Sequence, residues 1–168
     1  MRQARDDQPT LRRAVPGDAA LLRELNREVQ ALHAAAWPRR FKPTVSDQAP
    51  FAAMLAEPEA QAFIAEVHGK PAGYCYVTVQ RRPKNAFTTA CTTLYIDQIA
   101  VLRAYQGHGV GAALIGRAKA LVDELAADRL ALDVWEFNAR ARRFFAGQGF
   151  AVYNERMQIE RMQIEMGG

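Results

Sequence analysis

The sequence predicts an α/β (α+β) protein, in which one mixed central sheet of six to seven strands is flanked by about four helices. Two patterns support this prediction. Residues 110–125 carry apolar side chains at a spacing of three and four, which is typical of a helix with one buried face. Residues 94–101 are rich in β-branched and aromatic side chains, as in a buried strand. Elements of both kinds follow one another along the chain, and this order indicates a sheet covered by helices.

The first third of the chain predicts one strand and two helices. Residues 10–15 suit a short strand that a Pro-Gly pair stops. Asp18 is a candidate N-cap for a helix that runs to about residue 36, and Pro38 ends it. A second, weaker helix is expected over residues 46–56. The apolar face of the first helix comprises Leu22, Leu25, Val29, Leu32 and Ala36.

The middle of the chain predicts a hairpin and then a long strand. Residues 61–68 and 72–80 are strand-like and are separated by Gly-Lys-Pro. The next strand spans about residues 89–102, and its apolar alternation changes phase at Asp97 and Gln98. Because strand side chains alternate between two faces, this slip indicates one extra residue, a β-bulge, which bends the strand and leaves backbone groups unpaired.

Three alternate glycines follow this strand in the stretch Gln106-Gly107-His108-Gly109-Val110-Gly111. Glycine has no Cβ to keep a ligand from the backbone, and the first turn of a helix leaves amide groups without partners. The loop is therefore a candidate anion cradle, most naturally for a pyrophosphate.

The last part of the chain predicts a strand over residues 130–135, a short helix over residues 138–147 and a return to the sheet at Gly149 and Phe150. The pentapeptide Glu-Arg-Met-Gln-Ile then occurs twice in succession, beginning at Glu155. One copy suits a last strand. The second copy could extend that strand, pair with another subunit in a homodimer, or form a tail.

Composition favours one globular domain over residues 10–168, after a flexible tail at residues 1–9. No apolar run approaches the roughly 18 residues of a membrane span. The net charge of +4 is dispersed rather than gathered in a stripe, so we expect neither nucleic acid nor a membrane as a partner. Cys75 and Cys91 form no disulfide framework, which favours the cytoplasm. No metal site is expected.

Two motifs make residues 10–159 similar to the GNAT superfamily of acyl-coenzyme A-dependent N-acyltransferases. The signature (Arg or Gln)-x-x-Gly-x-(Gly or Ala) matches Gln106, Gly109 and Gly111. A second signature, an Asn before a short helix and a Gly-Phe pair, matches Asn138 and Gly149-Phe150. The resemblance implies a GNAT-like, mostly antiparallel sheet. It also implies an acetyltransferase that moves the acetyl group of acetyl-CoA directly to an amine of a small molecule or a protein.

The resemblance assigns cofactor contacts to three segments. The pyrophosphate of acetyl-CoA would lie on the loop residues Gln106, Gly107, His108, Gly109, Val110, Gly111 and Ala112. The pantetheine arm would pair with Ile99, Ala100 and Val101 of the bulged strand. Asn138 and Phe145 of the short helix would complete the contacts, and Arg142 or Arg143 could meet the 3′-phosphate.

An amine acceptor is mostly protonated at neutral pH, so the reaction needs a base. Asp97 at the bulge is the first candidate, Asp133 is the second because relatives use an acidic residue there, and Glu66 is a weaker third. Many relatives carry a Tyr at the position of Phe145 to protonate the departing thiolate. The candidate replacements are Tyr95, Tyr105 and Tyr153, unless the thiolate needs no acid. The acceptor pocket is expected to contain His33, Trp37 and Phe41.

Two other functions fit part of the sequence. A non-catalytic acyl-CoA-binding sensor would keep the glycine loop and lack proton-transfer groups, as Phe145 in place of Tyr suggests. A dinucleotide-binding fold would use Gly107, Gly109 and Ala112 with Glu136 on the ribose. The chain after Glu136 is too short for the rest of such a fold.

Overall fold

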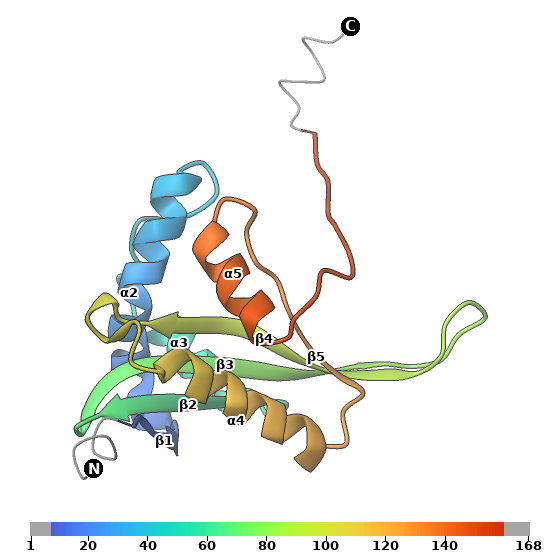
Figure 1. Ribbon diagram of the computed structural model, residues 1–168, viewed down its shortest axis with the longest axis horizontal. Helices are drawn as coiled ribbons and strands as arrows, with labels where there is room; N and C mark the ends of the chain where they lie inside the picture. The colour runs from blue at the N-terminus through green and yellow to red at the C-terminus, as the bar shows by residue number, and fades with distance from the viewer. Residues whose placement is uncertain (1–7, 160–168) are drawn as a thin grey trace, which may run out of the picture.

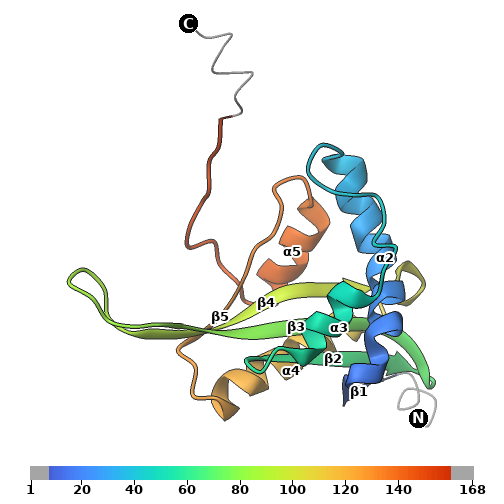
Figure 2. The same ribbon diagram turned by 180° about the vertical axis from the view of Figure 1, so that it is seen from behind.

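The computed structural model describes residues 8–159, which form one sheet with helices packed on both of its faces (Figures 1 and 2). Within this range, the elements in chain order are β1 (Thr10–Arg13), η1 (Pro16–Asp18), α2 (Ala19–Ala36), α3 (Ala49–Ala56), β2 (Ala60–Val67), β3 (Lys70–Arg82), β4 (Cys91–Val101), η2 (Arg103–Tyr105), α4 (Val110–Glu124), β5 (Arg129–Leu132) and α5 (Ala139–Gly147). None of the helices in the described residues is long and apolar enough to cross a membrane.

The sheet is mixed and has the strand order β1-β2-β3-β4-β5. The pairs β1/β2, β2/β3 and β3/β4 are antiparallel, whereas β4 and β5 are parallel. The prediction of six to seven strands is wrong for the described residues, which contain five. The difference lies after α5, where residues 150–159 follow no regular structure because they pair with no strand. The second pentapeptide copy and residues 1–7 of the expected tail lie outside the described residues.

The other predicted elements are present, with shifted ends. The weaker helix α3 begins at Ala49, and β5 ends at Leu132, so Asp133 lies in the following loop rather than on a strand. Asp18 occupies the N-cap position of α2, but its carboxylate accepts hydrogen bonds from Arg12 and the Val15 amide instead of capping the helix. Leu32 is 49% exposed, contrary to the predicted apolar face, because the last turns of α2 extend past the sheet (Figure 1).

The sheet separates two apolar clusters. The cluster on the α4 face includes Phe63, Leu94, Ile96, Leu114, Leu121 and Phe145. The cluster on the α2 and α3 face includes Leu22, Leu25, Phe51, Ile64, Tyr74 and Ala100. Alternate side chains of β2, β3 and β4 supply the two clusters, as the period of two requires.

The predicted bulge is confirmed by the register of β3 against β4. Gln98 pairs with Tyr76 and Ile96 pairs with Val77, so Asp97 has no partner in β3. The extra residue restores the apolar side chains after it to the α4 face, where Ile99 and Val101 pack against the same cluster as Leu94 and Ile96. The bulge therefore explains why the apolar alternation changes phase at Asp97 and Gln98.

Candidate active site

The glycine loop between η2 and α4 contains glycines with two different roles. Gly107 and Gly109 have φ angles of 87° and 77°, the left-handed region that favours glycine, and a Cβ on either would meet nothing within 4 Å. Their surroundings are therefore open, as a ligand cradle requires. A Cβ on Gly111 would instead lie 2.9 Å from Cζ of Phe144, so Gly111 allows α4 to pack closely against α5.

The loop is attached to the sheet and to α2. The side-chain amide of Gln106 donates to the Val101 carbonyl at 3.1 Å, and the Arg103 amide donates to Glu28 of α2 at 2.7 Å. Gly109 begins α4 without a side-chain cap, so the first amides of the helix have no side-chain partner at that position. These contacts hold an uncapped helix N-terminus beside the end of β4, which favours an anion there.

The end of β4 is open on the side of β5. The parallel pairing with β5 covers only Thr93 to Ile96, and no described strand pairs with Ile99, Ala100 and Val101 on that side. On the other side these three residues pair with β3. Apart from the Val101 carbonyl, which Gln106 contacts, the backbone groups of residues 99–101 that face away from β3 are therefore available to an extended ligand.

Asp97 projects from the bulge beside two tyrosines. Its Oδ2 atom accepts a hydrogen bond from Thr78 Oγ1 at 2.6 Å. Partial desolvation by the surrounding protein raises the pKa of Asp97, and the Thr78 hydrogen bond opposes this effect. Burial, with the charge of Asp97 as a smaller cause, raises the pKa of both Tyr76 and Tyr95. Tyr76 pairs with Gln98 and Tyr95 is two residues before Asp97, so both tyrosines flank the bulge.

Asp133 lies near one of these tyrosines, Tyr95, although it is outside the strand. The Tyr95 hydroxyl donates a hydrogen bond to Asp133, and burial together with this carboxylate raises the pKa of Tyr95. The structure therefore brings Asp97 and Asp133 together around Tyr95. Glu66 is elsewhere, because it forms an ion pair with Arg12 of β1 at 2.9 Å, two strands from β4.

A buried network of hydrogen bonds holds Gln98, the residue that follows Asp97 at the bulge. The fully buried Tyr74 of β3 accepts a hydrogen bond from Asn26 Nδ2 at 2.8 Å and donates one to Gln98 Oε1 at 2.5 Å. Burial strongly raises the pKa of Tyr74, so its hydroxyl keeps its proton. Asn26 and Tyr74 were not predicted as site residues, although an Asn on the buried face of an amphipathic helix is a signal of a satisfied polar contact.

The predicted pocket residues His33, Trp37 and Phe41 lie together, joined by two further rings. Trp135 is centred 5.3 Å from both Trp37 and Phe41, and Phe137 is centred 5.9 Å from His33. We call His33, Trp37, Phe41, Trp135 and Phe137 the aromatic cluster. It connects the end of α2 to the loop after β5, and burial lowers the pKa of His33.

Three residues at this cluster were not predicted from the sequence: Trp135, Phe137 and Arg40. The Arg40 guanidinium lies 4.9 Å from the centre of the Trp135 ring and 5.8 Å from that of Trp37, a cation–π arrangement. The sequence signal for this cluster was the presence of two large aromatic residues, Trp135 and Phe137, shortly after Asp133.

The α5 residues expected to contact a cofactor have visible structural roles. Asn138 Oδ1 accepts a hydrogen bond from the Ala141 amide at 3.1 Å and so caps α5. Phe145 is 7% exposed and packs edge-on against Phe144 and Phe150. Arg142 and Arg143 are exposed on the same helix. Their predicted contacts with acetyl-CoA remain predictions.

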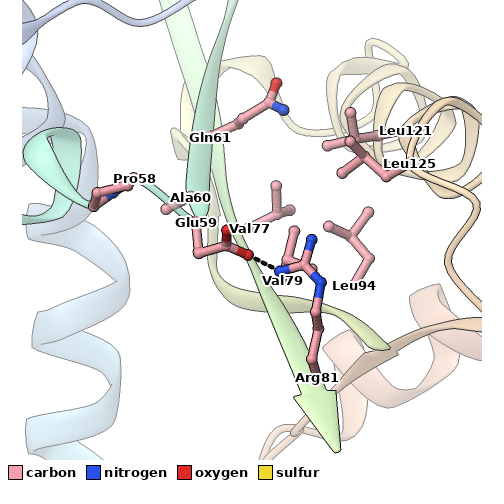
Figure 3. Close-up of a pocket in the computed structure, with 10 residues that line it drawn as sticks. All are labelled: Pro58, Glu59, Ala60, Gln61, Val77, Val79, Arg81, Leu94, Leu121 and Leu125. Carbon is pink, nitrogen blue, oxygen red and sulfur yellow. Dashed lines mark hydrogen bonds and ion pairs between the residues drawn. The ribbon is translucent and has the colours of Figure 1, made fainter. Parts of the chain in front are cut away.

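A shallow pocket of about 120 Å³ lies at the opposite end of α4 from the glycine loop (Figure 3). An ion pair between Arg81 and Glu59 crosses it, and Leu94, Leu121 and Leu125 line its apolar side. Neither the glycine loop nor the two aspartates line this pocket. In residues 8–159, no group of three or more His, Cys, Asp or Glu side chains could hold a metal ion.

Comparison with known proteins gives a family and a fold. The sequence profile of the acetyltransferase (GNAT) family matches residues 23–150, which is most of the chain. A tetramutant of the BH1408 protein of Bacillus halodurans superimposes with a TM-score of 0.85 at 21% identity, over 90% of this chain and 99% of that chain. No curated protein sequence matches this chain significantly.

Two solved aminoglycoside acetyltransferases share the fold. AAC(6′)-Iy, in complex with the bisubstrate analog CoA-S-monomethyl-acetylneamine, gives a TM-score of 0.70 at 18% identity, over 92% of this chain and 97% of that chain. The enzyme meta-AAC0020 from an uncultured soil metagenomic sample, in complex with sisomicin, gives 0.66 at 15% identity, over 92% and 96%. At these identities the likeness establishes the fold.

Proposed function

Because the chain belongs to the acetyltransferase (GNAT) family, we propose that it moves the acetyl group of acetyl-CoA directly to an amine acceptor in a ternary complex. One observation carries this proposal: the open loop of left-handed Gly107 and Gly109 leads into α4 beside the unpaired end of β4. Such a loop suits a pyrophosphate, and such a strand end suits an extended arm that contains amides.

The chain's own residues would bind both substrates and move one proton. Acetyl-CoA supplies the activated acyl group when it is bound. The backbone of residues 107–112 would hold its pyrophosphate, and residues 99–101 would orient its amide-containing arm, with a backbone amide near Ile99 polarising the carbonyl. Asp97 would accept the amine proton, because its raised pKa brings its basicity closer to neutral pH. Asp133 is the second candidate for this role.

No dedicated acid is required in this proposal. Phe145 cannot donate a proton, and Tyr153 is 72% exposed. Tyr105 packs against the apolar cluster on the α4 face. Burial and the hydrogen bond to Asp133 raise the pKa of Tyr95. The thiol of CoA has an ordinary pKa of roughly 8.5, so its thiolate is a weak base and leaves without assistance. We therefore assign proton transfer to the amine side of the reaction.

The acceptor would lie on the α2 face of the sheet. Asp97 and Asp133 supply negative charge there, and the aromatic cluster supplies a wall suited to an ammonium group. Small cationic amines are the acceptor class that this chemistry favours. Aminoglycosides head the test panel, because AAC(6′)-Iy and meta-AAC0020 share the fold. The cytoplasm is the proposed location.

A non-catalytic acyl-CoA sensor is the second candidate, favoured by the absence of an acid at Phe145. Thiol release from acetyl-CoA with a panel of amines separates the two functions. A transferase releases CoA thiol when an acceptor is present, whereas a sensor binds acetyl-CoA and releases none.

Calorimetric titration with acetyl-CoA, and in parallel with NADH, tests the cofactor assignment. We expect micromolar binding of acetyl-CoA alone, and loss of that binding in Gly109→Val, whose side chain fills the open space in front of the loop. Gly69→Val is the matched control, because Gly69 also has a left-handed φ, of 71°, and open surroundings but lies in the turn between β2 and β3, away from the loop. Unchanged affinity in Gly109→Val, or binding of NADH alone, would overturn the pyrophosphate assignment.

A further inference from the structure

Arg40 lies over the aromatic cluster with its hydrogen-bond donors free. Its Cζ atom lies 4.9 Å from the centre of the Trp135 ring and 5.8 Å from that of Trp37. Among residues 8–159, no acceptor or carboxylate contacts this guanidinium, although Glu136 directly follows Trp135 in the chain. A guanidinium over a ring directs its N–H groups outward in its own plane, so the edge of Arg40 can bind a planar anion.

The turn after α2 holds Arg40 in this position. The Arg40 amide donates to the Trp37 carbonyl at 3.0 Å. Two residues later, the Lys42 carbonyl accepts a hydrogen bond from Gln30 of α2 at 2.6 Å. Both views show the loop between β5 and α5 beside this end of α2 (Figures 1 and 2). A guanidinium that is already ordered loses little conformational entropy when it binds a ligand.

Charges of opposite sign lie close together in this region. Asp97 and Asp133 supply negative charge where the amine would react. Arg40 and the exposed Lys42 supply positive charge at Trp135, two residues after Asp133. A second ammonium group of an acceptor would be repelled beside Arg40, whereas a carboxylate would be attracted and could form two parallel hydrogen bonds. The charges therefore favour an acceptor that is cationic at one end and anionic at the other.

We propose that Arg40 binds a carboxylate of the acceptor and so determines which amines the site accepts. Because this role rests on the proposed acetyl transfer, it narrows the acceptor class to ω-amino carboxylates, whose amine and carboxylate lie at opposite ends of a chain. Trp135 follows Asp133 by two residues, and two residues of extended chain span about 7 Å. The amine and the carboxylate must therefore be separated by several bonds, which excludes acceptors that carry both on one carbon atom.

Acceptors of equal length that differ only at the far end test this role. The panel contains ω-amino acids from aminobutyrate to aminooctanoate, each with the monoamine and the diamine of the same length. The best ω-amino acid should exceed its monoamine in kcat/KM by about tenfold, because a charged hydrogen-bonded pair forms only with the carboxylate. The diamine should be the poorest of the three. Equal values for ω-amino acid and monoamine at every length overturn the proposal.

The variant Arg40→Gln should lose the preference for the carboxylate and keep the wild-type kcat/KM for the monoamine. Arg40 is exposed, so its loss should not disturb folding. Arg39→Gln is the matched control, because Arg39 is also exposed but makes no ring contact among residues 8–159, and it should keep the preference. A preference that survives in Arg40→Gln, or a loss of acetyl-CoA affinity in that variant, overturns the proposal.

The tryptophans report binding at Arg40 without any acetyl transfer. The sequence contains two, Trp37 and Trp135, and Arg40 lies over both. Titration with ω-aminohexanoate in the presence of CoA should change their fluorescence saturably in the wild type but not in Arg40→Gln. This result without thiol release from acetyl-CoA would support the carboxylate site while the proposed function fails. No saturable change with any ω-amino acid would overturn the role of Arg40, even if other amines are acetylated.

Discussion

Removal of the Tyr74 hydroxyl tests the network that supports the bulge. The substitution Tyr74→Phe keeps the buried ring but deletes the hydrogen bonds to Asn26 and Gln98. Each bond contributes about 0.5–1.5 kcal/mol, and a stranded buried amide costs about 1–3 kcal/mol more. Asn26 is only 8% exposed, so water cannot easily replace its lost partner. We expect a loss of about 3 kcal/mol, which lowers the melting temperature by roughly 6–12 °C.

Urea unfolding followed by tryptophan fluorescence measures this loss. The double variant Asn26→Leu/Tyr74→Phe removes the stranded amide as well, so it should be destabilised by less than the sum of its single variants. A loss below about 1 kcal/mol in Tyr74→Phe, or strictly additive single effects, would show that the network contributes little. We also expect a lower kcat in Tyr74→Phe with unchanged acetyl-CoA affinity, because Gln98 adjoins Asp97.

Three further predictions concern charge and packing. Asp97→Asn should lower turnover at neutral pH at least tenfold while acetyl-CoA affinity is kept. Wild-type turnover should fall as the pH drops through the raised pKa of Asp97, because only the ionised carboxylate accepts a proton. A flat pH–rate profile would exclude this base. Arg12 lowers the pKa of Asp18, so the unfolded chain binds the Asp18 proton more tightly than the folded chain does. The resulting stabilisation is present above the ordinary pKa of about 3.9 and is lost as the pH falls below that value. Acid unfolding of Asp18→Asn, which should lack this stabilisation, measures it against wild type. Gly111→Ala should destabilise by about 1–3 kcal/mol through its contact with Phe144, and Phe144→Leu should relieve part of the loss in thermal unfolding.

The local features of the fold were predictable because they leave local patterns. The apolar phase slip at Asp97 predicted the bulge, and the spacing of residues 110–125 predicted α4. The glycine stretch predicted an open loop, but the sequence could not separate Gly109, which needs a left-handed conformation, from Gly111, which needs room for Phe144. That distinction depends on α5, which is distant in the sequence.

Long-range pairing limited the rest of the prediction. Trp135 joins the aromatic cluster only because the loop after β5 meets the end of α2, and no spacing within either segment indicates this contact. The first pentapeptide copy, residues 155–159, suits a last strand but pairs with no described strand, because strand formation depends on a partner edge that the pattern does not specify. Tyr95 of β4 likewise meets Asp133 of the loop after β5, a contact between segments that are distant in the sequence.

The fold should also accept a β4 strand without the bulge residue. Deletion of Asp97 would leave Ile96 and Gln98 as neighbours, and the register against Tyr76 and Val77 would become continuous. Every apolar side chain of β4 would keep its face, so the shortened chain should fold at least as stably as the full one while lacking the proposed acetyl transfer. Such a variant would serve as an inactive scaffold, in which β4 is regular and the proposed base Asp97 is absent.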